Sequence, residues 1–445
     1  MIHLKTILFP SISNRQATLV VIITVAFLIP DTMIGTVSDF LVPQTTSVWG
    51  ISYFVVISVV FALSQYLLLR FVWLKTKDLR SKSFLFNGMQ KIVIASQCIL
   101  LAILIVIIYQ ILFISQYYTA LLVWATLISF LLTIVLLSIL ARKFFMWYRY
   151  YRRDSLIVLS YALAFIIISM NTALVLVVDM HSFSSKQGIV NPNSEVVFLD
   201  FDNANWLILL FQYIYNYTEL ISFVLIWGAT ALLLLSYRKK LGLVKFWIMI
   251  SLPLVYYLGT FIDITGLYDP QSDPDSFFFY LYLSLNSTAG GLLFGIAFIT
   301  IAKRIDNLRI KGYMTLAAFG FILFFISNQI SLAASSYPPF GITTLMYLGL
   351  SSYLLLIGLY STAVSLSEHA QLRKSIRNSI DQQHSRLLDP IGMSELQKEI
   401  DKRITPLIQR HAEQMNMQTA IDLPVSEDEI KQYIKEVLDD LHHEK

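Results

Sequence analysis

The sequence predicts an all-α fold: a polytopic transmembrane helix bundle followed by an amphipathic helical tail. First, 56% of the 445 residues are hydrophobic and only 14% are charged, whereas an ordinary soluble domain is about 25% charged. Second, the apolar residues gather in runs near the length of roughly 20 residues that a helix needs to cross a bilayer. Third, Lys and Arg concentrate in alternate connections between these runs. Because a spanning segment must satisfy its own backbone polar groups, each run is expected to be a helix.

Ten apolar segments define the predicted spans and form a transmembrane bundle over residues 1–366. They lie near 17–35, 50–72, 92–114, 118–141, 155–178, 206–235, 245–263, 276–302, 312–334 and 342–366. The first apolar run is short and follows Lys5 and Arg15, which is also typical of a signal peptide. No clear small-x-small cleavage site follows it, so we interpret it as an uncleaved span.

The charged connections predict the direction of the spans. One set of alternate connections is basic. The other set contains Lys186 as its one basic residue and several acidic residues, with Asp31 and Asp179 among them. Because basic connections remain cytoplasmic, we expect a multi-pass protein of the cell membrane with both termini cytoplasmic and an acidic outward face. The basic clusters that carry this prediction lie at 70–91, 142–153, 238–245 and 303–311.

Motifs for the common catalytic chemistries are missing from the sequence. There is no Walker loop, dinucleotide fingerprint, HExxH motif or nucleophile elbow. The seven histidines fall outside the predicted spans, and the single cysteine, Cys98, has no Cys or His neighbour. We therefore expect no enzymatic activity, no cofactor and no metal, and we expect Cys98 to be a small buried side chain. The basic connections are thin, so no nucleic-acid partner is expected.

A carboxylate within the sixth span is the main candidate site. Glu219 lies in FQYIYNYTELISF (211–223), where a charge at mid-bilayer costs about 2.5–3.5 kcal/mol on insertion scales. Asn216 and Phe223 share its helical face, and Gln212 lies one turn further away. The candidate polar partners on other spans are Asn171, Asn286, Asn328 and Gln329.

Three interpretations of Glu219 remain open. A protonated Glu219 can join helices by hydrogen bonds as a structural polar knot. A titrating Glu219 can serve proton- or cation-coupled transport. A third interpretation is a sensing pocket whose occupancy shifts the tenth span and the tail. Five-plus-five parity and a predicted interruption at Pro30-Asp31 favour transport, whereas the helical tail favours a relay. Gly290 and Gly291 predict either close helix approach or a break in the eighth span.

The composition changes after the tenth span, and residues 367–445 are predicted to form a cytoplasmic helical tail. Pro390 and Gly392 are expected to interrupt it, and Ser394 with Gln397 is expected to form a capping box. Near the C-terminus apolar residues recur at helical spacing. This face either packs on the protein's own loops or docks a cytoplasmic partner or a second copy. The predicted docking face comprises Ile430, Tyr433, Ile434, Val437, Leu438 and Leu441.

Three stretches carry a family resemblance: SSYPPFGITTLMYLGLSSYLLLIGLYSTAVSLSEHAQLRKSIRNS (335–379), LLDPIG (387–392) and SEDEIKQYIKEVLDDL (426–441). Over residues 335–445 the chain resembles an uncharacterised family of multi-pass membrane proteins from ammonia-oxidising archaea. The resemblance implies an archaeal cytoplasmic membrane and supplies no activity, ligand or catalytic residue.

The sequence as a whole favours a non-enzymatic membrane sensor or scaffold that relays to a cytoplasmic partner through its C-terminal helices. The tail and the missing catalytic motifs carry this interpretation. The alternative is a secondary transporter with a proton- or cation-coupled site at Glu219.

Overall fold

The computed structural model describes most of the predicted bundle and a short piece of the tail. The described residues are 13–36, 41–76, 84–150, 156–184, 188–194, 206–235, 238, 242–264, 276–303, 307–328, 337–368, 391–392, 394–396 and 398. The predicted docking face at 430–441 lies outside the described residues, so it remains a prediction.

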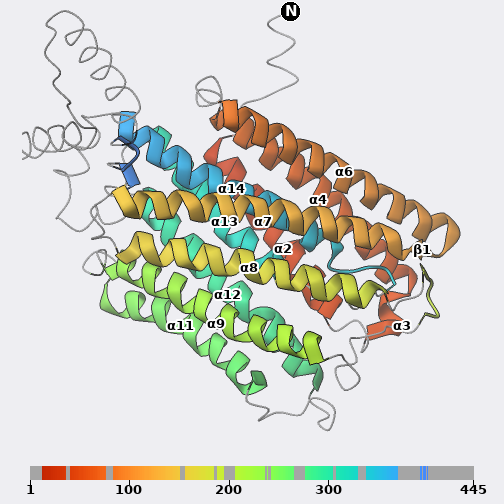
Figure 1. Cartoon of the computed structure of the whole chain (residues 1–445). Helices are drawn as coiled ribbons and strands as arrows, with labels where there is room; N and C mark the ends of the chain where they lie inside the picture. Colours follow the sequence, from red (N-terminus) through yellow and green to blue (C-terminus); the bar gives the residue numbers. More distant parts are fainter. Residues whose placement is uncertain are drawn as a thin grey trace, which may run out of the picture.

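Ten long helices occupy the positions of the ten predicted spans within the described residues (Figure 1). A short helix, α3 (Val42–Thr45), precedes the second of them. The ten are α2 (Asn14–Thr36), α4 (Val48–Lys75), α6 (Phe84–Ile114), α7 (Thr119–Tyr150), α8 (Leu156–Ser184), α9 (Trp206–Leu235), α11 (Leu243–Ile264), α12 (Ser276–Lys303), α13 (Leu308–Ser327) and α14 (Ile342–Glu368).

The chain is an all-α, multi-pass membrane protein. Over the described residues, eight helices are long and apolar enough to cross a membrane: α2, α4, α6, α7, α8, α9, α13 and α14. The other two, α11 and α12, lie at the predicted seventh and eighth spans, but many of their side chains are outside the described set. The total of ten spans therefore remains a prediction.

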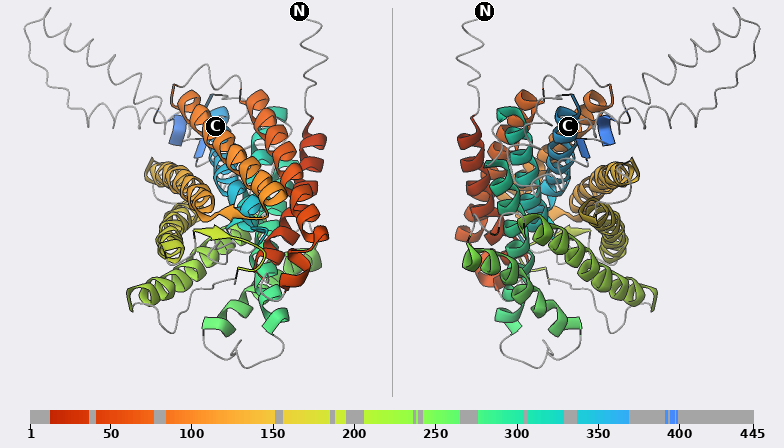
Figure 2. Two further views of the ribbon diagram at one scale, coloured as in Figure 1. Left: turned by 90° about the vertical axis from the view of Figure 1, so that its right-hand side faces the viewer. Right: turned by 90° about the vertical axis from the view of Figure 1, so that its left-hand side faces the viewer.

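Two helices form the centre of the bundle and the others surround them. Residues 342–359 of α14 are all buried, and α13 is nearly as enclosed. Contacts between neighbours run from α2 through α4, α6, α7, α8, α9, α11 and α12 and back to α2, around the α13–α14 pair. The two end views show α14 inside this arrangement, with α9 at the periphery (Figure 2). The helix α14 is therefore central and enclosed by protein, although in the sequence it looks like any other apolar span.

Glycines let the central helices approach closely. A Cβ on Gly358 would lie 2.4 Å from the backbone nitrogen of Ala317, and one on Gly320 would lie 2.6 Å from that of Leu355. Small residues at such points let helix backbones come together, which drives association in a bilayer where burial of apolar surface does not. The α13–α14 interface therefore depends on residues that have no side chain.

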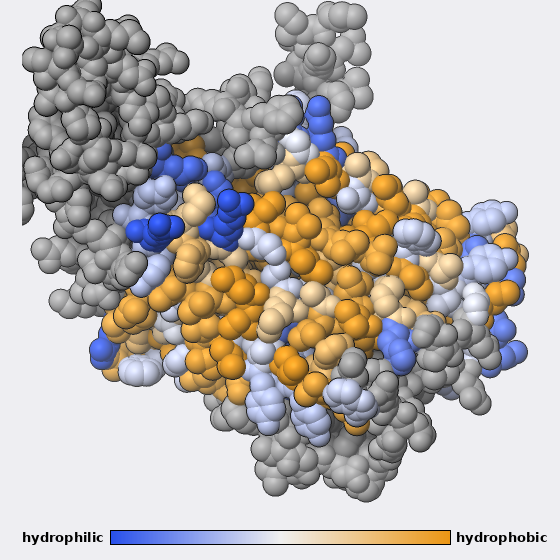
Figure 3. Space-filling model, in the orientation of Figure 1, coloured by the Kyte–Doolittle hydropathy of each residue, from blue (hydrophilic) through white to orange (hydrophobic). Residues whose placement is uncertain are grey.

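The surface that faces lipid is apolar. Hydrophobic residues cover the middle of the face in Figure 3, and hydrophilic residues lie nearer its two ends. Large side chains on α6 are exposed, including Ile105 at 58% and Phe113 at 73%. Cys98 on the same helix is exposed as well, so the expectation of a buried cysteine is wrong. A thiol is apolar enough to face acyl chains, and hydropathy cannot separate a lipid-facing position from a buried one.

A two-stranded antiparallel sheet joins two connections at one end of the bundle. Strand β1 (Tyr117–Tyr118) pairs antiparallel with β2 (Ile189–Val190). Nearby, the Tyr337 ring stacks on Tyr117 with centroids 6.2 Å apart, and its hydroxyl donates to the carbonyl of Ile111 at 3.3 Å. These contacts tie the connection that precedes α14 to the end of α6.

Two acidic residues that were expected in connections lie in helices. Asp31 is in α2 and Asp179 is in α8, and both are fully buried. The predicted interruption at Pro30-Asp31 is also wrong, because α2 continues through Pro30 to Thr36. Proline removes one backbone donor, and membrane helices tolerate this loss where neighbouring groups satisfy the freed carbonyl.

Candidate functional site

Asp31 binds the beginning of α14. Its Oδ1 accepts the backbone N–H of Gly341 at 2.9 Å, and its Oδ2 accepts that of Thr344 at 3.2 Å. The hydroxyls of Thr343 and Thr344 donate to Oδ2 at 2.5 and 2.8 Å. The first N–H groups of a helix lack partners within the helix and favour a negative charge. A carboxylate from α2 therefore caps α14 from a position 310 residues away in the chain.

The backbone before α14 is shaped to present these donors. Gly341 has a φ of +90°, a conformation that favours glycine. Its N–H points to Asp31, and Ile342 then begins the helix. The sequence Gly-Ile-Thr-Thr thus supplies one turn residue and two hydroxyl donors to a single carboxylate. We name this contact, formed by Asp31, Gly341, Thr343 and Thr344, the α14 cap.

The predicted polar site in the sixth span is brought together in part. Thr218 donates its hydroxyl to Oδ1 of Asn171 at 2.5 Å, which links α9 to α8 next to Glu219. Glu219 is half-buried, and the side chain of Tyr215 hydrogen-bonds to it one turn away. Asn171, Thr218 and Glu219 therefore lie at one level of the α8–α9 contact.

The remaining predicted members of this site have different positions. Asn216 is half-buried on α9. Asn328 ends α13, where its backbone N–H donates to Phe324, and no hydrogen bond joins it to Glu219 among the described residues. The side chains of Gln212, Asn286 and Gln329 lie outside the described residues, so their predicted roles remain open.

The two glycines of α12 confirm close helix approach. A Cβ on Gly290 would meet the ring of Phe223 at 2.8 Å, and one on Gly291 would meet Cβ of Phe325 at 2.3 Å. The helix α12 continues through both glycines. The alternative that they break the eighth span is therefore wrong.

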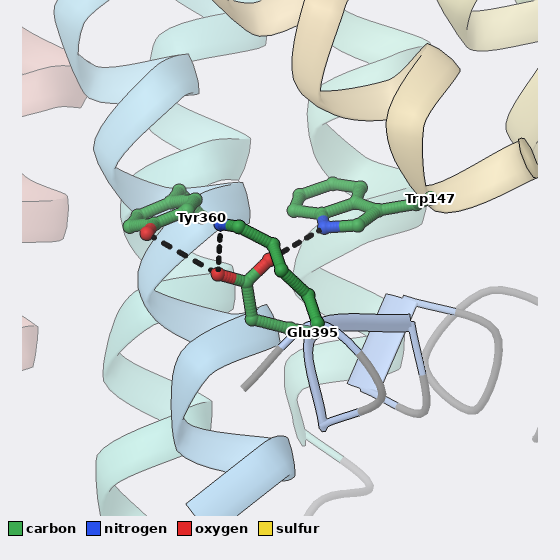
Figure 4. Close-up of polar contacts among 4 residues, drawn as sticks. Trp147, Tyr360 and Glu395 are labelled. Atoms are coloured by element: carbon green, nitrogen blue, oxygen red, sulfur yellow. Dashed lines mark hydrogen bonds and ion pairs between the residues drawn. The ribbon is translucent and has the colours of Figure 1, made fainter. Parts of the chain in front are cut away.

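A second buried carboxylate holds the tail against the bundle. Glu395 is 8% exposed. Its Oε2 accepts the indole N–H of Trp147 at 3.1 Å, and its Oε1 accepts the Tyr360 hydroxyl at 3.4 Å (Figure 4). Lys398 Nζ donates to Oε1 at 3.2 Å. Trp147 belongs to α7 and Tyr360 to α14, so one tail residue bridges these two helices.

A hydroxyl of the tail completes this contact. Ser394 donates to the backbone carbonyl of Trp147 at 2.7 Å. Ile391 and Gly392 are helical, but the residues just before Ile391 lie outside the described part of the chain, so the predicted interruption at Pro390 and Gly392 stays a prediction. Gln397, the predicted partner of Ser394 in a capping box, lies outside the described residues, so that prediction is not tested. We name the contact formed by Trp147, Tyr360, Ser394, Glu395 and Lys398 the tail clasp.

Neither Asp31 nor Glu395 was predicted as a site residue. Asp31 follows a proline and looks like the start of a connection, and Glu395 lies in a charged stretch that is typical of a solvated helix face. The threonine pair at 343–344 and the tryptophan in FFMWYRYYRRD (144–154) are signals of hydrogen-bond donors near membrane level. Neither signal identifies its partner.

Comparisons of the chain with models of protein families, with curated proteins and with solved structures find no match. The family resemblance over residues 335–445 therefore remains a prediction.

Proposed function

We propose that this integral membrane protein is a non-enzymatic sensor or scaffold that relays to a cytoplasmic partner through α14 and its C-terminal helices. The observation that carries the proposal is that α14 is held by a carboxylate near each end. Asp31 of α2 binds its beginning, and Glu395 of the tail contacts Tyr360 near its other end. A displacement at the α14 cap thus has a direct structural route to the tail clasp.

Burial of α14 supports this proposal. The helix packs on α2, α4, α6, α7 and α13, and its residues 342–359 are buried. Closely packed interiors transmit strain because they contain few voids to absorb it. Coupling between distant sites needs an element whose equilibrium both sites bias, and α14 has the contacts for that role.

The positive-inside pattern supports a cell-membrane protein with both termini cytoplasmic. The tail clasp lies at the end of α14 remote from β1 (Figure 1). In the proposed orientation the α14 cap faces outward and the tail clasp faces the cytoplasm. The resemblance over residues 335–445 supports an archaeal membrane.

Hydrogen exchange in nanodiscs tests the relay. The variant Asp31→Asn weakens the α14 cap without removing volume, and we expect faster exchange both at residues 341–345 and at residues 391–398. The matched control is Ser52→Ala, since Ser52 is exposed on α4 and bonds only to its own helix among the hydrogen bonds of the described residues. Faster exchange at residues 341–345 with unchanged exchange at the tail clasp would contradict the relay.

A secondary transporter is the second candidate function. The observation that favours it is a half-buried carboxylate, Glu219, beside the Thr218–Asn171 hydrogen bond between two spanning helices. Intramembrane carboxylates of this kind mark ion paths in many transporters. Ion-coupled uptake into proteoliposomes that disappears in Glu219→Gln and persists in Ser222→Ala would select this function over the relay. Ion-coupled uptake that is equal in these two variants, or absent from both, would reject the transporter.

A further inference from the structure

A group of cations surrounds the tail clasp. Lys143 lies one helical turn before Trp147 on α7, is half-buried, and places its Nζ 4.5 Å from the centroid of the Tyr360 ring. It interacts electrostatically with Lys398, Glu395 and Arg142. Lys143 therefore lies near two other cations and one carboxylate.

The carboxylate of Glu395 does not balance this charge. Its Oε1 already accepts Tyr360 and Lys398, and its Oε2 accepts Trp147. The only ion pair that the structure shows within this group, among the described residues, joins Lys398 to Glu395. Lys143 thus carries a partly desolvated charge on a ring face, close to a second ammonium group. An additional anion between the two lysines would relieve their repulsion.

The position of the lysines indicates which anion is available. Lys143 lies near the end of α7 in FFMWYRYYRRD, where aromatic and basic residues alternate as they do at headgroup depth. Val135, about two turns before Lys143 on the same helix and 55% exposed, offers an apolar surface to acyl chains. Basic pockets between helices at this depth bind phosphate-bearing head groups.

We propose that Lys143 and Lys398 bind the phosphate of an anionic phospholipid headgroup at the junction of α7, α14 and the tail. Each ammonium offers three N–H donors to phosphate oxygens. The Tyr360 ring holds Lys143, and Glu395 holds Lys398, so both donors are fixed before the lipid arrives. This binding extends beyond the proposed relay and does not depend on it.

Native mass spectrometry of the full-length protein released from detergent tests the proposal. Phosphatidylglycerol, phosphatidylcholine and inorganic phosphate are the three probes. We expect the wild type to retain phosphatidylglycerol in preference to phosphatidylcholine. Lys143→Gln and Lys398→Gln should each weaken retention about fivefold, the effect of about 1 kcal/mol per basic residue. Lys143→Arg keeps the charge and should restore most of the retention.

The control variant is Lys303→Gln, which removes an exposed lysine from the last turn of α12. Retention that falls equally in this control would overturn the proposal in favour of diffuse surface charge. Binding of inorganic phosphate that depends on Lys143 and Lys398, without competition by phosphatidylglycerol, would overturn the lipid assignment and indicate a free phosphate. Hydrogen exchange in the Asp31→Asn variant reports on the relay separately, so either proposal can fail alone.

Discussion

Asp31 shows how a buried carboxylate is stabilised at membrane level without a basic partner among the contacts that the structure shows. Four hydrogen bonds from the beginning of α14 supply the stabilisation, two from the backbone and two from threonine hydroxyls. The positive end of the helix macrodipole adds to them. Asp31 therefore contributes to the position of α14 as well as to the satisfaction of its first turn.

Removal of the Asp31 carboxylate should cost about 2–3 kcal/mol, since it deletes a helix cap and leaves buried donors without an acceptor. Asp31→Asn keeps one acceptor and should cost less than Asp31→Ala. Unfolding in mixed micelles, followed by circular dichroism, measures both free energies. Ser52→Ala on exposed α4 surface should stay within about 0.5 kcal/mol of the wild type. An Asp31→Ala protein as stable as that control would contradict the cap.

Trp147 and Tyr360 should contribute unequally to the tail clasp. The indole N–H lies 3.1 Å from Glu395, whereas the Tyr360 hydroxyl lies 3.4 Å from it. Trp147→Phe leaves a buried carboxylate oxygen without its donor, and we expect faster tryptic cleavage after Lys398. Tyr360→Phe should accelerate cleavage less. The reverse order, or cleavage in Trp147→Phe at the wild-type rate, would show that the indole does not hold the tail.

At the scale of the helix, the α13–α14 contact depends on backbone approach. A Cβ on Gly358 would lie 2.4 Å from the Ala317 nitrogen, so the two helices would have to separate. By contrast, a Cβ on Gly228 of α9 meets nothing within 4 Å. These two glycines form a matched pair, because both lie inside long helices of the bundle.

Gly358→Ala should destabilise the protein by about 1–3 kcal/mol through overpacking. Gly228→Ala should be neutral or stabilise it by up to about 1 kcal/mol, because alanine is the better helix former. The midpoint of thermal unfolding in detergent separates the two variants. A Gly358→Ala protein that melts at or above the Gly228→Ala midpoint would mean that α13 and α14 are packed less tightly than the structure shows.

At the scale of the whole molecule, the charge pattern of the connections is the sole basis for predicting which side of the membrane each helix end faces. Val48 is 78% exposed at the beginning of α4, and Arg149 is exposed near the end of α7. Under the positive-inside prediction, Val48 lies outside and Arg149 lies in the cytoplasm. Introduction of a single cysteine at either position in a Cys98→Ser background allows each side to be labelled.

A membrane-impermeant maleimide added to intact cells should label Val48→Cys and should label Arg149→Cys only after the membrane is opened. Cys98→Ser alone is the control for background labelling. Labelling of Arg149→Cys alone in intact cells would reverse the predicted orientation. Labelling of both variants in intact cells would place these helix ends on one side and would contradict the predicted alternation.

Much of the helical architecture could be predicted from the chain, but little of the candidate site could. The segment 342–366 corresponds to α14 (Ile342–Glu368), because local hydropathy and the need to satisfy backbone groups in lipid determine where such a helix forms. The sequence also predicts Asn171 as a polar partner near Glu219. It does not predict the burial of Asp31, because a carboxylate beside a proline has the local signature of a connection.

The sequence by itself determined the helical class, the positions of the long helices and the charge asymmetry of their connections, since all of these depend on residues close together in the chain. Only the tertiary structure decided which helices are central and that Cys98 is exposed on the surface of α6. It also decided that Asp31 binds α14 and that Glu395 binds α7 and α14. Those contacts join residues 310 and 248 positions apart. Hydrogen-bond donors of this kind are common along the chain, so their partners are selected by three-dimensional packing and leave no local pattern.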